Sequence, residues 1–370
     1  MHITHANLFT DGAFHMGSID FDTKINGIGP AELPGDLDAG GDYVIPGLID
    51  IHTHGAMGED ASDGKGEGLI TMSRYYAARG VTSWCPTTMT LKEPVLRTAA
   101  EAIRDFRLPA DGAKIAGMNL EGPFLCYAKR GAQAAENLHA PDIDMFRRLN
   151  EASGGQIRLV TVACEEPGAL GFIREASREC TVSLGHTTAD YDTAMAAYEA
   201  GASHATHLFN AMPGLLHRAP GVIGAASDAG ATVELICDGL HIHPSVIRLT
   251  HRLFGEKLIM ISDSLRCAGM PDGDYTLGGQ PITMKAGKAV LTGTDTLAGS
   301  SIHLMDALCR SVSFGVPLTA AVTAVTEAPA RVIGREKEIG TLAAGACADL
   351  CILDHDLNLK AVFVDGRRII

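Results

Sequence analysis

The chain has 370 residues, of which 46% are hydrophobic and 20% are charged, a balance typical of an ordinary globular protein. Its formal net charge of −14 argues against non-specific binding to nucleic acid, which requires a basic surface. The N-terminus lacks the regions of a signal peptide, and apolar stretches stay below membrane-spanning length. The nine cysteines are scattered without a CxxC pair, which suits a reducing compartment. We therefore expect a cytoplasmic protein that binds neither nucleic acid nor membrane.

Both ends of the chain are predicted to form β structure. Residues 1–43 contain short strands and turns rich in Gly, Asp and Pro. Residues 341–370 contain two apolar runs and then Asp365-Gly366, a hairpin signal. Strands at both termini indicate one small β domain assembled from these two segments. Residues 44–340 then form the larger domain.

Between the termini, short β-branched apolar runs alternate with helical stretches, the pattern of a parallel α/β sheet. The runs are Val44–Ile51, Thr82–Pro86, Lys114–Leu120, Arg158–Val162, Thr181–Leu184, Ser203–His207, Thr232–Ile236 and Leu258–Ile261. The helices predicted between them include Leu69–Arg79, Thr188–Ala200 and Pro244–Phe254. Eight strand–helix repeats predict an α/β fold, a (β/α)8 barrel of the TIM type. A doubly wound open sheet is the alternative, but its Gly-rich phosphate fingerprint is absent after the first run.

Metal-binding residue types follow the ends of five of these runs. The residues are His52 and His54 after the first run, Glu121 after the third, His186 after the fifth, His207 at the end of the sixth and Asp263 after the eighth. Catalytic groups of such a barrel lie at the C-terminal ends of its strands, so these side chains are expected to converge on one rim. Each residue also has an ordinary explanation, because a buried His often bonds to the backbone and a carboxylate often caps a helix. Their shared position favours a site for one or two divalent ions, with zinc or iron best suited to imidazole and carboxylate.

Other histidines carry weaker signals. A second His-x-His pair, His241 and His243, follows the seventh run and is able to supply ligands. We expect His241 to face the substrate instead. His204, near the start of the sixth run, is expected to be structural. The cysteines near strand ends lack a His/Asn partner and are expected to fill space.

Several motifs occur in a characteristic order, namely PGLIDIHTHG, NLEGPF, GHT, ATHLFNAMP, CDGLH, ISDS and TLAGS. In these motifs the chain resembles the N-acetylglucosamine-6-phosphate deacetylases, a family of the amidohydrolase superfamily, over nearly its whole length. LEGPF and THLFNAMP are highly specific, whereas His-x-His is common in the superfamily. The resemblance implies metal-dependent hydrolysis of the acetamide of N-acetylglucosamine 6-phosphate to glucosamine 6-phosphate and acetate. It also implies a homodimer with substrate contacts across the interface.

The resemblance further implies a role for each site residue. Glu121, His186 and His207 bind the metal, and Asp263 is the general acid/base that acts on a metal-activated water. His52 and His54 are present here, so a second ion sharing Glu121 is chemically possible. The substrate contacts map onto Ala132, Gln133, Asn210, Ala211, Arg218, Asp238, His241, Leu297, Ala298 and Gly299.

Two of these substrate contacts raise a question of charge. Gln133 occupies a loop position that is His in some family members, and a glutamine cannot carry charge there. A dianionic substrate nevertheless needs a local cation in a chain of net charge −14, and Arg218 fits that need. The ordinary alternative for Arg218 is a solvated loop residue.

Three functional alternatives remain open. The first is deacetylation of N-acetylgalactosamine 6-phosphate, because the two sugars differ at a single hydroxyl. The second is hydrolysis of a cyclic amide, but many such enzymes bridge two metals with a carboxylated lysine, and no lysine ends a predicted strand. The third is a non-catalytic sugar-phosphate sensor, which would have lost the metal-binding residues or Asp263, and both are present.

Overall fold

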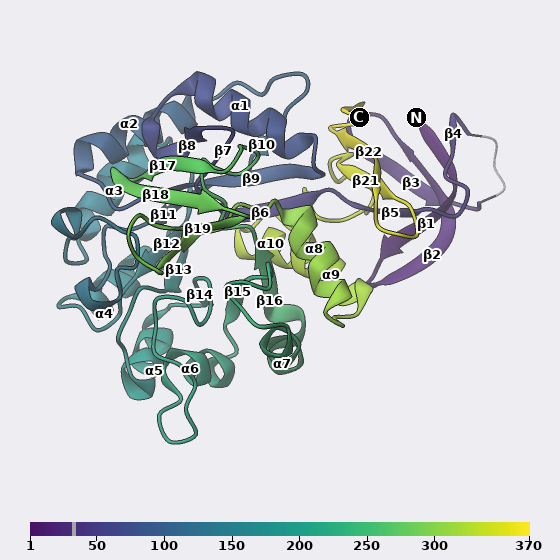
Figure 1. The fold of residues 1–370 in the computed structure, drawn as a ribbon. Coiled ribbons are helices and arrows are strands. Elements are labelled where there is room, and N and C mark those ends of the chain that lie inside the picture. The colour runs from purple at the N-terminus through teal and green to yellow at the C-terminus, as the bar shows by residue number, and fades with distance from the viewer. Residues whose placement is uncertain (32–34) are drawn as a thin grey trace.

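The computed structural model describes residues 1–31 and 35–370 (Figure 1). A barrel of parallel strands with surrounding helices forms the larger part, and a smaller sheet lies beside it. Both ends of the chain lie in the smaller sheet. This arrangement confirms the predicted (β/α)8 barrel with a β domain built from the N- and C-terminal segments.

The barrel is built from eight parallel strands that pair in chain order. They are β6 (Leu48–Thr53), β9 (Val81–Thr88), β11 (Met118–Glu121), β12 (Ile157–Val162), β13 (Thr181–Leu184), β14 (His204–Ala205), β15 (Thr232–Ile236) and β16 (Leu258–Ile261), with β10 (Lys114–Ile115) as an extra pairing on β9. Two backbone hydrogen bonds join the last strand to the first. The Asp263 N–H donates to the His52 carbonyl and the His54 N–H donates to the Ser264 carbonyl, both at 2.9 Å. These two bonds close the barrel at the ends of β6 and β16.

The first predicted strand, Val44–Ile51, is wrong as a single element. The structure divides it into β5 (Tyr43–Pro46), which belongs to the smaller sheet, and β6 of the barrel. The backbone changes partners between the two, because the Gly47 N–H donates to the Asp349 carbonyl and the Leu48 N–H donates to the Gly80 carbonyl. Gly47 also packs so closely on Thr82 that a side chain would collide there. Hydrophobicity alone therefore does not mark the point at which the chain leaves the smaller sheet and enters the barrel.

The helices alternate with the barrel strands along the chain. They are α1 (Gly66–Ala77), α2 (Glu93–Arg104), α3 (Ile143–Ala152), α4 (Ala169–Ala176), α5 (Tyr191–Ala200), α6 (Gly221–Ala229), α7 (Pro244–Phe254), α8 (Leu304–Ser313), α9 (Leu318–Val325) and α10 (Glu327–Val332). The single-turn 3-10 helices are η1 (Ala61–Asp63), η2 (Tyr127–Lys129), η3 (Ala135–Asn137) and η4 (Gly255–Lys257). Asp142 and Asp190 begin α3 and α5 by accepting backbone N–H groups of the first turn. Among the described residues, every helix is too short or too polar to cross a lipid bilayer.

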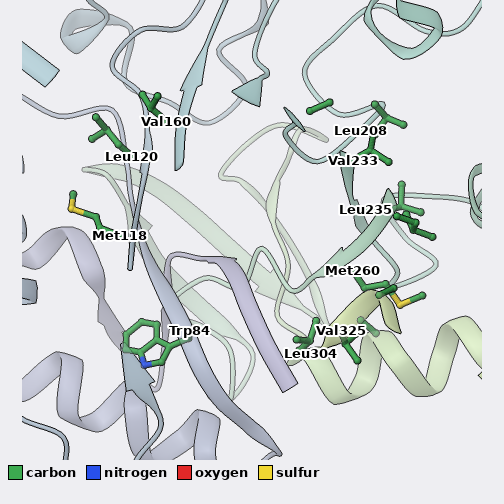
Figure 2. Packing of buried hydrophobic residues seen from close by; sticks show 14 of the residues in the cluster. Trp84, Met118, Leu120, Val160, Leu208, Val233, Leu235, Met260, Leu304 and Val325 are labelled. Atoms are coloured by element: carbon green, nitrogen blue, oxygen red, sulfur yellow. The ribbon is translucent and has the colours of Figure 1, made fainter. Parts of the chain in front are cut away.

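The main core lies between the barrel strands and these helices. In α2 the buried residues Leu96, Ala99, Ala100 and Ile103 recur three or four positions apart, so one face of the helix packs inward. Figure 2 shows members of this core distributed around the strands rather than gathered at one side. Burying apolar surface all around the barrel holds the strand ends, and hence the side chains they carry, in fixed positions.

The smaller sheet has the strand order β23-β22-β21-β5-β1-β2-β3, with β4 paired to β1. Its strands are β1 (His2–Thr10), β2 (Ala13–Phe21), β3 (Ile25–Gly29), β4 (Leu37–Asp38), β5, β21 (Leu350–Leu353), β22 (Leu359–Val364) and β23 (Arg367–Arg368). Asp365 and Gly366 join β22 to β23 with φ angles of 47° and 71°. A two-residue hairpin turn of type I′ needs positive φ at both positions, so the Asp-Gly signal is confirmed.

Two antiparallel sheets interrupt the strand–helix alternation. The short pair is β7 (Gly55–Ala56) with β8 (Glu59–Asp60). The longer insertion follows β16 and consists of β17 (Gly273–Leu277), β18 (Gln280–Lys285), β19 (Lys288–Leu291) and β20 (Leu297–Gly299). In Figure 1 it is the green sheet in front of the barrel. The alternation of strands and helices in the sequence does not predict this insertion.

Candidate metal centre and active site

Six buried side chains meet at the C-terminal ends of the barrel strands. They are His52 and His54 at the end of β6, Glu121 at the end of β11, and His186, His207 and Asp263 just beyond β13, β14 and β16. Each is at most 7% exposed. They fall into two groups, one of His52, His54 and Asp263 and the other of Glu121, His186 and His207. Within each group one ligand atom per residue lies within 4.8 Å of the others.

Glu121 stands between the two groups. Its Oε1 lies 2.9 Å from His207 Nε2 and 3.1 Å from His186 Nε2. Its Oε2 lies 3.2 Å from His54 Nε2. Asp263 Oδ1 approaches His54 Nε2 to 3.3 Å from another direction. This single carboxylate thus contacts both groups, since its Oε1 also lies 3.5 Å from Nε2 of His52.

The ring nitrogens show what the centre is built to hold. His54 and His186 each place Nδ1 against a carbonyl oxygen, that of Thr87 at 3.2 Å and that of Lys129 at 2.8 Å. A carbonyl oxygen only accepts hydrogen bonds, so Nδ1 is the donor, and in the neutral ring Nε2 carries a lone pair that faces the centre. His186 Nε2 and His207 Nε2 are only 3.1 Å apart, and the buried His52 Nε2 has no hydrogen-bond partner. Lone pairs converging on one point, with carboxylates beside them, fit one or two divalent cations.

The electrostatics of the centre agree with this fit. Burial raises the pKa of Glu121, but His52 and then His186 and His207 outweigh burial and hold that pKa well below its usual value. Burial lowers the pKa of His54, but Asp263 and Glu121 outweigh burial and raise it to about 9. The two carboxylates therefore favour positive charge at this point of the barrel. A bound divalent cation would supply this positive charge without protonation of the histidines.

The backbone at three of these residues has an uncommon conformation. His186, His207 and Asp263 have φ angles of 48°, 27° and 48°, in the left-handed region that residues other than glycine seldom adopt. Each lies two residues beyond the end of a parallel strand, where the chain turns away from the barrel. Such strain persists only where surrounding packing enforces it, and it clusters at functional sites.

A cavity of about 430 Å³ opens beside the centre. Of the residues predicted to contact substrate, those that line it are Ala132, Gln133, Asn210, Ala211, His241, Leu297, Ala298 and Gly299. Asp238 is not part of the lining, but its Oδ2 lies 2.7 Å from Nδ1 of His241 and orients that ring. Arg218 lies away from the cavity, on an exposed part of its loop, where its guanidinium contacts His217 at 2.7 Å.

Three residues matter to the site in ways that the sequence analysis misses. Gln133 donates from Nε2 to Oε2 of Glu121 at 2.7 Å, while its Oε1 accepts the Thr90 N–H at 2.7 Å, so it orients the carboxylate that stands between the two groups. Lys129 is the one lysine or arginine among the cavity-lining residues that the structure describes. Glu234 is buried below the centre, against His52. A glutamate inside the apolar run Thr232–Ile236 is the signal that marks it in the sequence.

Comparisons with known proteins agree with this geometry. The chain matches the model of the amidohydrolase family over residues 43–369. It is 36% identical to N-acetylglucosamine-6-phosphate deacetylase from Vibrio furnissii over 330 residues, which are 88% of this chain and 82% of that protein. It is 34% identical to N-acetylgalactosamine-6-phosphate deacetylase from Escherichia coli O157:H7, over 88% of this chain and 87% of that protein. The structure superposes with a TM-score of 0.94 and 33% identity, over 100% of this chain and 99% of the other, on a mutant N-acetyl-D-glucosamine-6-phosphate deacetylase from Mycobacterium smegmatis in complex with N-acetyl-D-glucosamine-6-phosphate.

The match to the family model spans most of the chain, and the identity to the Vibrio furnissii enzyme extends over 88% of it. The cluster of four imidazoles and two carboxylates stands where the motifs place it. The chain therefore belongs to the amidohydrolase family and, within it, to the N-acetylglucosamine-6-phosphate deacetylases.

Proposed function

We propose that this protein hydrolyses the acetamide of N-acetylglucosamine 6-phosphate, giving glucosamine 6-phosphate and acetate. The observation that carries the proposal is the junction of the metal-binding residues with a cavity of about 430 Å³. Pockets of roughly 300–1,000 Å³ hold small organic ligands, so a phosphorylated amino sugar is of suitable size. The similarity to deacetylases at 36% and 34% identity supports the same chemistry.

The cofactor in this proposal is one or two divalent ions, zinc or iron. Three imidazoles or carboxylates per ion, with a position left open, are the ligand set of catalytic sites for these metals. When bound there, a divalent cation lowers the pKa of a water molecule from about 15.7 towards 7 and supplies a nucleophile at neutral pH. Glu121, His186 and His207 would hold one ion. His52 and His54 would hold a second, with Glu121 shared.

Asp263 is proposed to move the proton. Burial raises the pKa of this carboxyl, but hydrogen bonding to His54 and the charge of His52 outweigh burial and lower it, so the group is ionised at neutral pH. Asp263 lines the cavity and can take the proton of the attacking water as its oxygen bonds to the acetamide carbon. It then returns that proton to the sugar nitrogen as the C–N bond breaks. The proton count balances without a covalent intermediate on the protein.

The phosphate needs a cation, and two residues are proposed to supply it. Lys129 lines the cavity of its own chain. Arg218 lies outside that cavity, on an exposed loop beside the exposed Leu215 and Leu216. We propose that the protein is a homodimer in which Arg218 of one copy reaches the phosphate bound by the other. The cysteines are all unpaired, which supports a cytoplasmic location.

The test is release of acetate from a matched set of substrates. The set contains N-acetylglucosamine 6-phosphate, its galacto epimer and both sugars without phosphate; ring opening of a cyclic amide is followed separately, because it releases no acetate. We expect the highest kcat/KM for N-acetylglucosamine 6-phosphate. A higher value for the galacto epimer would move the assignment to that sugar, and a preference for unphosphorylated sugars would contradict recognition of the phosphate. Failure of the metal-loaded protein to hydrolyse any of these amides would leave a sugar-phosphate sensor.

Two variants separate the proposed phosphate contacts. Lys129→Met and Arg218→Met each remove a charge-assisted hydrogen bond worth about 1.5–3 kcal/mol. Each should lower kcat/KM about ten- to a hundredfold on the phosphorylated sugar and leave the rate on the unphosphorylated sugar unchanged. Equal losses on both sugars would show that the residue supports the fold or the metal centre instead. If Arg218 acts across an interface, its effect should disappear in a monomeric form while that of Lys129 stays.

A further inference from the structure

Glu234 is a fully buried glutamate in the middle of β15, directly below the metal centre. Its Oε2 accepts from Nδ1 of His52 at 2.9 Å and from the backbone N–H of His207 at 3.0 Å. Its Oε1 lies 3.2 Å from Nε2 of His204. One side chain thus connects the strands β6, β14 and β15, and two of its three partners belong to residues of the metal centre. The mechanism proposed above makes no use of it.

The contact with His52 decides which ring nitrogen faces the centre. A carboxylate accepts hydrogen bonds, so it holds the proton of His52 on Nδ1 and leaves the lone pair on Nε2. That Nε2 is buried, has no hydrogen-bond partner, and lies 3.5 Å from Glu121 Oε1 and 3.6 Å from Asp263 Oδ1. A carboxylate behind a histidine ligand also raises the basicity of the ring, which strengthens its bond to a metal.

Among the four histidines of the centre, His52 alone has a carboxylate on its Nδ1. Nδ1 of His54 and Nδ1 of His186 are held by the carbonyl oxygens of Thr87 and Lys129. Nδ1 of His207 has no partner, but the backbone N–H of His207 is bonded to Glu234. That bond restrains a residue whose φ of 27° is strained, so Glu234 acts on both ligand groups.

We propose that Glu234 is a positioning residue of the metal centre, which selects the metal-binding tautomer of His52 and ties His52 to His207. The inference rests on the metal-dependent function proposed above, because it concerns how that centre is assembled. The inference concerns neither the identity of the substrate nor the proton transfer by Asp263.

Two substitutions separate the charge of Glu234 from its geometry. In Glu234→Gln the amide oxygen can still accept from His52 and His207, while the amide NH2 faces His204. A neutral His204 can accept there from Nε2, because its Nδ1 lies 2.7 Å from the hydroxyl of Thr232. The glutamine therefore keeps the tautomer of His52 and removes the negative charge. Glu234→Leu has a similar volume but removes both the charge and the acceptor.

The experiment measures the affinity of the full-length protein for Zn²⁺ by competition with a chromophoric chelator, together with the visible spectrum of the Co²⁺ form. Partners of histidine ligands typically contribute 10- to 100-fold to metal affinity. We expect Glu234→Leu to weaken at least one Zn²⁺ by about 100-fold and to change the Co²⁺ spectrum. Glu234→Gln should weaken the same ion by about tenfold and keep the spectrum of the wild type.

Asp42→Asn is the matched control. Asp42 is also a buried carboxylate, 7% exposed, but its partner is Lys360 Nζ at 2.5 Å, away from the centre. This variant should lower the melting temperature and leave both Zn²⁺ affinity and the Co²⁺ spectrum unchanged. Wild-type Zn²⁺ affinity in a folded Glu234→Leu would overturn the inference, as would loss of affinity in step with melting temperature in all three variants. A wild type that binds no metal would contradict the proposed function itself, so the two failures are distinguishable.

Discussion

Single residues at the barrel rim serve several neighbours at once. Asp263 shows this clearly: its side chain approaches His54 at 3.3 Å, its N–H bonds to the His52 carbonyl at 2.9 Å, and its own backbone is left-handed. The side chain lines the cavity, whereas the backbone closes the barrel. A substitution that changes only the terminal oxygen therefore tests chemistry without disturbing the closure.

Asp263→Asn should lower kcat by about 10²–10⁴-fold, because an amide keeps the shape but cannot carry the proton. KM should stay within a few-fold of the wild-type value, and metal content should stay close to that of the wild type. Steady-state kinetics with elemental analysis of the same samples provides the measurement. Asp42→Asn, a substitution at another buried carboxylate beside Lys360, serves as the control that leaves kcat intact. An Asp263→Asn enzyme within tenfold of the wild type would remove this residue from the mechanism.

The sequence predicts the location of a side chain well when that location depends only on the residue's position along a strand. All six metal-centre residues were expected at strand ends, and that is where they lie. Glu234 and Gln133 are different, because their roles depend on which side chain stands opposite, Glu234 against His52 and Gln133 against Glu121. Periodicity carries no information about such partners across the barrel. Arg218 is the reverse case, since its chemistry suited the phosphate but its loop leads away from the cavity of its own chain.

At the scale of elements, strands and helices were predictable where the chain alternates in the ordinary way. The predicted helix over Pro244–Phe254 has the observed bounds of α7, since a proline begins it and a glycine ends it. The sixth strand is shorter than predicted, because the backbone turns at the strained His207. The insertion β17–β20 was missed since its alternating pattern belongs to antiparallel hairpins, which the strand–helix repeat does not include.

Helix α8 has an unusual start that gives a pH-dependent stability. His303 is its N-cap: Nδ1 accepts the Asp306 N–H at 3.3 Å, and the Asp306 carboxylate accepts the His303 N–H at 3.4 Å. Only a ring with an unprotonated Nδ1 can accept this bond. Burial lowers the pKa of His303 below its usual 6.5. The unfolded chain therefore takes up a proton before the folded one as the pH falls, so this contribution to stability is complete above about pH 6.5 and declines below it.

Replacing His303 by serine should reduce that decline. Serine is a good N-cap that does not titrate, so His303→Ser should melt close to the wild type at pH 7.5 and above it at pH 5.5. Thermal unfolding of both proteins at the two pH values gives the measurement, and the difference between them cancels the other histidines. His303→Ala should lose about 1 kcal/mol at pH 7.5 as the control for a missing cap. Identical shifts in melting temperature of wild type and His303→Ser between the two pH values would contradict the assignment of His303 as the pH-dependent N-cap.

For the whole molecule, the metal centre should act as a structural element as well as a catalytic one. A ligand that binds only the folded state at a thousandfold excess over its Kd adds about 4 kcal/mol to the free energy of unfolding. Treatment with a chelator should therefore lower the melting temperature by several degrees, and Zn²⁺ should restore it. His186→Ala, which lacks a ligand of the group of Glu121, His186 and His207, should respond much less to either treatment. Equal melting of the wild type with and without chelator would show that the centre holds no tightly bound ion.

The closure of the barrel between β6 and β16 has a consequence for the order of biosynthesis. The residues proposed to hold the ions, His52, His54, Glu121, His186 and His207, have all been made once the chain reaches residue 207. Asp263, the proposed proton carrier, is made later and joins them only when the last barrel strand pairs with the first. A nascent or truncated chain can thus offer metal ligands before it has the carboxylate that moves the proton. Activity, rather than bound metal, would then report that a chain has closed its barrel.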